Sequence, residues 1–114
     1  MAVEMRYEPS KRYTDERMEV YANKANVGTL QAMGNQLNWY PDDYTHNVKF
    51  QFRNYDTFAA VVEGLRQYKN EQGYKYITIW TYNYGYAAVL DRDMIEKVGF
   101  KNLPDNNPAC FFLE

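Results

Sequence analysis

The chain has 114 residues, 25% of them charged, and a formal net charge of −2. That length suits one domain with one hydrophobic core, and the ordinary share of charged residues argues against disorder throughout the chain. The slightly acidic balance disfavours a dedicated nucleic-acid-binding protein, which usually carries a basic stripe.

Cys110 is the single cysteine, so an internal disulfide is excluded. It stands in an apolar run, where we expect a small buried side chain rather than a nucleophile. No apolar run approaches the ~20 residues that span a bilayer, and no signal-peptide pattern precedes the first charges. We therefore expect a cytoplasmic protein without a membrane partner.

The N-terminal segment predicts short strands. Val3, Met5 and Tyr7 alternate with polar residues, which permits an edge strand. Arg17–Ala22 fits either a strand or the start of a helix. A turn is predicted at 23–26 by its composition.

The next segment is harder to assign. Val27–Met33 fits a strand at some positions and a helix at others. Gly28 and Gly34 count against a long helix. Residues 39–43 contain Pro41 and predict a turn.

A strand and a helix follow. Val48–Phe52 alternates cleanly and predicts a half-buried strand. Asp56 or Thr57 is the expected N-cap of the helix, and Gly73 is its expected stop. The apolar side of this helix has helical spacing at Phe58, Val61, Val62, Leu65 and Tyr68. Its expected solvated side carries Glu63, Arg66, Lys69, Asn70 and Glu71.

The C-terminal part predicts three more elements. Tyr74–Tyr82 is rich in β-branched and aromatic residues and predicts a strand. Asp91 or Asp93 can cap a short helix that ends at Gly99. Ala109–Leu113 predicts a final apolar strand.

The order of elements predicts an α+β sandwich. We expect one domain, residues 1–114, with a mixed, partly antiparallel sheet and two covering helices. A strand–helix–strand unit normally pairs its strands in parallel, so we expect Val48–Phe52 beside Tyr74–Tyr82.

From Val48 to Phe100 the chain resembles the GNAT N-acetyltransferase superfamily. The matching features are Gly73 and Tyr74 before a strand, Trp80–Asn83 at the end of that strand, and a Gly-Phe pair at Gly99 and Phe100. The resemblance implies an acetyltransferase-like fold and acetyl-coenzyme A as the cofactor. It places cofactor-binding residues at Phe50, Phe52, Arg53, Asn54, Thr57 and Asn83.

Two departures from the family's pattern concern activity. The phosphate loop should lie at 53–58, which lacks glycine, so side chains would obstruct a pyrophosphate. Asp56 would add a negative charge beside it. Ile95 stands where many members carry the tyrosine that protonates the leaving thiolate, and isoleucine transfers no proton.

Three interpretations stay open. The chain is a degenerate relative that binds a small molecule or protein partner, with weakened or lost acetyl-coenzyme A binding. Alternatively, it is a divergent N-acetyltransferase that acetylates an amine, with Tyr82 or Tyr84 as the acid. A third interpretation is a self-associating structural domain, such as a homodimer through a strand edge. The first is the leading hypothesis.

The partner surface we expect is rich in tyrosine. The chain has 12 Tyr, 6 Phe and 2 Trp, which suits either a wet binding surface or a small sheet. The rings that could line one groove are Trp39, Tyr40, Tyr44, Tyr55, Tyr82, Tyr84 and Tyr86. Nucleic acid is the weaker partner class, since stacking grooves for bases add a positive track.

His46 is the single histidine. Asp42, Asp43 and His46 could offer donors to a metal ion, but no second His or Cys completes a set. We expect a surface histidine and no metal site.

Overall fold

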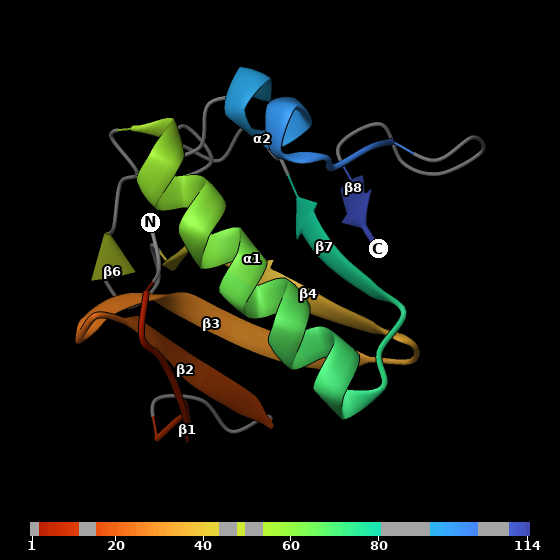
Figure 1. Cartoon of the computed structure of the whole chain (residues 1–114). Helices are drawn as coiled ribbons and strands as arrows, with labels where there is room; N and C mark the ends of the chain where they lie inside the picture. Colours follow the sequence, from red (N-terminus) through yellow and green to blue (C-terminus); the bar gives the residue numbers. More distant parts are fainter. Residues whose placement is uncertain (1–2, 12–15, 44–47, 50–53, 81–91, 103–109) are drawn as a thin grey trace.

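The computed structural model describes residues 3–11, 16–43, 48–49, 54–80, 92–102 and 110–114. Within them six strands form one mixed sheet, in the order β1-β2-β3-β4-β7-β8. Helix α1 (Tyr55–Gln72) crosses one face of this sheet, and the short helix α2 (Arg92–Val98) packs beside α1 (Figure 1). The expected α+β class, with a mixed sheet and helices, is confirmed.

Strands β1 to β4 follow one another as antiparallel neighbours. They are β1 (Met5–Pro9), β2 (Arg17–Ala22), β3 (Ala25–Met33) and β4 (Gln36–Tyr40). Asn23 and Lys24 make the β2–β3 turn with positive φ, and Gly34 makes the β3–β4 turn with φ +59°. The expected edge strand near the N-terminus is confirmed, and both ambiguous segments are strands.

The predicted turn at 39–43 is wrong. Trp39 pairs with Leu30 and Tyr40 with Thr29, so both aromatic residues belong to β4. Aromatic side chains favour a half-buried pleated surface, and that preference outweighs the turn signal of Pro41, which stands just past the strand. The predicted turn at 23–26 is also shorter than expected, because Ala25 and Asn26 already belong to β3.

The parallel pair in the main sheet differs from the expected one. β7 (Tyr76–Trp80) runs parallel to β4, with Gln36 opposite Tyr76. Of the predicted strand Val48–Phe52, the described part is β6 (Val48–Lys49), which pairs with β5 (Asp42–Asp43) in a separate two-stranded sheet. The chain therefore leaves the main sheet after β4 and returns through α1 to β7 (Figure 1).

The C-terminal strand closes the other side of the sheet. β8 (Cys110–Leu113) pairs antiparallel with β7, with Ile77 opposite Leu113. Lys101, after α2, makes a further antiparallel bridge with Phe112. Gly99 ends α2 with φ +121°, as predicted.

Helix α1 begins two or three positions earlier than predicted. Asn54 has extended backbone angles, and its side chain accepts a hydrogen bond from the Thr57 amide, so Asn54 is the N-cap and the expectation of Asp56 or Thr57 is wrong. The stop at Gly73 is confirmed by its φ of +82°. Lys69, expected on the solvated side, is buried.

The hydrophobic core lies between α1 and the covered face of the sheet. Trp39 and Phe58 stack there with ring centroids 6.1 Å apart, and both are almost completely buried. Ile95 of α2 and Phe100 also belong to this core. Among the described residues no helix is long and apolar enough to cross a membrane.

Candidate functional site

The structure tests only part of the predicted cofactor site. Asn54 and Thr57 lie at the start of α1. The other predicted site residues lie outside the described residues: Phe50, Phe52, Arg53, Tyr82, Asn83 and Tyr84.

The start of α1 is occupied by its own side chains. Asn54 Oδ1 accepts from the Thr57 amide at 2.8 Å, and the Asn54 carbonyl accepts from the Phe58 amide at 3.3 Å. Asp56 adds a carboxylate in the first turn. An anionic ligand would have to displace the cap and lie beside that carboxylate, so these residues do not fit a pyrophosphate.

The predicted aromatic groove is divided by the sheet. Trp39 lies in the core, where its Nε1 donates to the Val27 carbonyl at 3.0 Å. Tyr40, its neighbour in the same strand, points to the opposite face, where the Arg17 guanidinium lies 4.9 Å from its ring centroid. Tyr55 is on α1, beneath the Lys97 ammonium. Trp39 and Tyr40 therefore cannot line one groove, while Tyr44, Tyr82, Tyr84 and Tyr86 lie outside the described residues.

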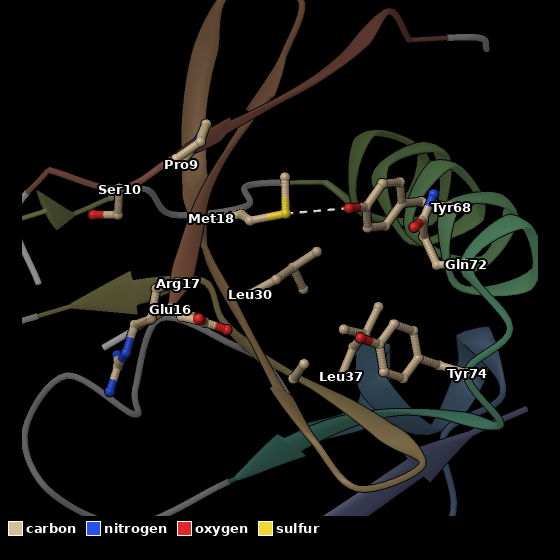
Figure 2. A pocket seen from close by; sticks show the side chains of 11 residues that line it. Pro9, Ser10, Glu16, Arg17, Met18, Leu30, Leu37, Tyr68, Gln72 and Tyr74 are labelled. Carbon is tan, nitrogen blue, oxygen red and sulfur yellow. Dashed lines mark hydrogen bonds between the residues drawn. The ribbon is translucent and has the colours of Figure 1, made fainter. Parts of the chain in front are cut away.

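A pocket that the sequence analysis did not predict lies at the other end of α1. Its volume is about 460 Å³, within the usual range for small-ligand sites. Figure 2 shows it between the strands and the last turns of the helix. Its lining residues are Pro9, Ser10, Glu16, Arg17, Met18, Leu30, Ala32, Leu37, Tyr68, Gln72 and Tyr74.

Three adjacent strands supply the apolar floor. Met18 of β2 pairs with Leu30 of β3, and Ala32 of β3 pairs with Leu37 of β4. Paired residues lie on the same face of a sheet, so these four side chains point together toward α1.

The helix supplies aromatic walls. Tyr68 and Gln72 are four positions apart, so they share one side of α1, and Tyr74 follows the helix stop. Tyr7 of β1 stacks on Tyr68 with ring centroids 3.9 Å apart, and its hydroxyl donates to the Gly64 carbonyl. This stacking holds the Tyr68 ring at the edge of the pocket.

The Tyr68 hydroxyl has a weak partner. It donates to the Met18 sulfur at 3.1 Å (Figure 2), and a thioether is a poor acceptor. Burial, and then the nearby Tyr74, raise the pKa of Tyr68, so the group stays a neutral donor at physiological pH. A ligand oxygen could replace the sulfur as its acceptor.

Some polar side chains at the rim of the pocket interact with other residues, and others do not interact with the described part of the chain. Ser10 donates to Glu19 at 2.5 Å, and Arg17 lies over Tyr40 on the far face. In contrast, the side chains of Glu16, Gln72 and Tyr74 make no hydrogen bond or ion pair with the described part of the chain. The pocket thus joins an apolar floor to three polar groups that have no partner among the described residues.

Lys69 and Cys110, whose side chains are of nucleophilic type, lie elsewhere. Lys69 Nζ donates to the Lys75 carbonyl at 3.1 Å, and desolvation, with a smaller effect of Arg66, lowers its pKa against an opposing effect of Glu114. Cys110 is buried as expected, and burial raises its pKa to about 11. Neither side chain lines the pocket.

No cluster of three metal-ligating side chains occurs among the described residues. His46 lies outside them, so its expected surface position remains a prediction.

The comparisons with known proteins give no relative. No protein-family model, no curated protein and no solved structure matches this chain.

Proposed function

We propose that this protein is a small-ligand-binding domain on an acetyltransferase-like arrangement of strands and helices, with the pocket at the end of α1 as its site. The observation that carries the proposal is a pocket of about 460 Å³ with an apolar floor. It is bordered by Glu16, Gln72 and Tyr74, whose side chains lack partners within the described residues. Convergent polar groups around an apolar cavity are typical of ligand sites.

The proposal includes weak or absent binding of acetyl-coenzyme A. The cap formed by Asn54 already uses the Thr57 amide, and Asp56 disfavours an anion in the first turn. The glycine-free sequence at 53–58 supports the same conclusion, because side chains there restrict the approach of a phosphate.

A working N-acetyltransferase is the second candidate. The observation in its favour is a parallel strand pair connected through a helix, here β4 and β7 through α1, although the family resemblance expects Val48–Phe52 rather than β4 as the strand before that helix. That function would require acetyl-coenzyme A and an acid such as Tyr82 or Tyr84. Replacing both tyrosines with Phe would then abolish turnover.

The deciding experiment compares ligand binding by the wild type with ligand binding by a variant whose pocket is filled. Acetyl-coenzyme A, coenzyme A and a fragment library are titrated into the wild type and Ala32→Phe, by thermal shift and calorimetry. Ala32 lines the pocket floor and is exposed, so a larger side chain fills the pocket with little strain. Ligands that bind only the folded state raise its melting temperature.

We expect library compounds that stabilise the wild type and not Ala32→Phe, and no shift with millimolar acetyl-coenzyme A. Ala25→Phe, an exposed change on the same strand but outside the pocket, is the matched control. Micromolar binding of acetyl-coenzyme A would contradict the proposal, as would ligands that still bind to Ala32→Phe.

A further inference from the structure

We propose that the pocket at the end of α1 selects a small ligand with a methylated ammonium group, held by the Glu16 carboxylate and the rings of Tyr68 and Tyr74. This inference rests on the proposed function and adds the chemical class of the ligand. It depends on the charge at the pocket rim, on the aromatic walls and on the lack of acceptors in the floor.

The charge facing the pocket is negative. Glu16 and Arg17 are the two charged residues in its lining. The Arg17 guanidinium is directed away, toward the Tyr40 ring on the far face, while the Glu16 carboxylate is directed toward the apolar side chains (Figure 2). Among the described lining residues, a ligand in the pocket therefore meets one carboxylate and no cation directed toward it.

The aromatic walls suit a cation as well. Tyr68 and Tyr74 extend from the helix side toward the strands, opposite Glu16 in Figure 2. The face of an aromatic ring attracts an ammonium group within about 6 Å of its centroid. Two tyrosine rings and one carboxylate provide the groups that recognise an organic cation.

The apolar floor favours methyl groups over N–H groups on that cation. No side chain of the floor offers an oxygen acceptor, and the Met18 sulfur already accepts a hydrogen bond from the Tyr68 hydroxyl. The floor consists of Met18, Leu30, Ala32 and Leu37. A primary ammonium would bury N–H donors against this floor without partners, which is costly. A trimethylated ammonium has no N–H group and presents methyl surface instead.

The test uses two probes of nearly equal shape. Choline and 3,3-dimethylbutan-1-ol differ in that a carbon replaces the charged nitrogen. Their dissociation constants are measured by amide chemical-shift titration of the full chain, at low and at high salt, with ethanolamine as the primary-amine probe. We expect choline to bind about fivefold more tightly than the alcohol, with the preference reduced at high salt, and ethanolamine to bind more weakly than choline.

Variants assign the preference to the pocket. Glu16→Gln should weaken choline binding about two- to fivefold, Tyr74→Leu by a similar factor, and neither should weaken the alcohol as much. Glu63→Gln is the matched control, because Glu63 is exposed on α1 and does not line the pocket. The melting temperature of each variant verifies that it is folded.

The outcomes separate this inference from the function on which it rests. If the alcohol or ethanolamine binds as tightly as choline, the preference for a methylated cation is refuted and the binding pocket stands. The preference is also refuted, and the pocket stands, if choline fails to bind while other compounds bind to the wild type and not to Ala32→Phe. If no compound depends on the pocket, both proposals are refuted.

Discussion

The two ends of α1 differ in the hydrogen-bonding side chains that remain available to a ligand. At the first end Asn54 holds the Thr57 amide, and Phe58 is buried against Trp39. At the second end the backbone is equally satisfied, since the amides of Gly73 and Tyr74 donate to the carbonyls of Asn70 and Lys69. Around the second end, the side chains of Glu16, Gln72 and Tyr74 have no partner among the described residues and border a cavity with an apolar floor. At the first end the cap therefore competes with a ligand for the Thr57 amide, whereas at the second end three side chains are available to a ligand.

The largest expected effect contrasts core packing at the two ends. Phe58→Ala removes a completely buried ring and should lower the free energy of unfolding by about 3–5 kcal/mol. Tyr68→Ala removes a half-buried ring that contacts the pocket and should cost less. Urea denaturation of both variants measures the contrast, and equal losses would show that the pocket end is packed as tightly as the core.

A smaller effect is expected at the cap. Asn54→Ala should lower stability by about 1 kcal/mol, whereas Asn54→Ser should retain most of it because serine also caps helices. Asn70→Ala, at an exposed position inside α1, is the control. If Asn54→Ala gained affinity for coenzyme A in a calorimetric titration, the cap itself would be what blocks the helix start.

The smallest effect concerns pH and Lys69. Its lowered pKa means that the unfolded chain binds more proton than the folded chain between that value and the ordinary value of 10.5. Stability from this group therefore rises with pH across that window. As pH rises through this window, the unfolding free energy of the wild type should therefore increase relative to that of Lys69→Met. A difference between Lys69→Met and the wild type that does not change with pH would contradict the assignment.

Much of the architecture was predictable from local patterns. The spacing of Phe58, Val61 and Leu65 gave the buried side of α1, and Gly73 gave its end, because both signals act over a few residues. The parallel partner of β7 was mispredicted, since alternation at 48–52 describes a strand without saying which sheet receives it. Lys69 was misassigned because a long stem can bury beside a carbonyl acceptor, here that of Lys75.

The pocket was missed for a related reason. Met18, Leu30 and Leu37 each look like ordinary core residues, and only strand register brings them together. One usable signal was present: Tyr68 and Gln72 continue the apolar side of α1 with increasingly polar residues. Such a gradient indicates that the last turn of a helix covers its sheet incompletely.

The parallel pairing of β4 with β7 has a consequence for the order of folding. β1 to β4 can assemble as successive hairpins, because each pairs with its neighbour in sequence. The contact of β4 with β7 requires closure of a long loop that contains all of α1, and loop closure before stabilising contacts slows such steps. We therefore expect the antiparallel strands β1 to β4 to form first, and β7 and then β8 to dock late. The pocket would then be completed only in the last stage of folding.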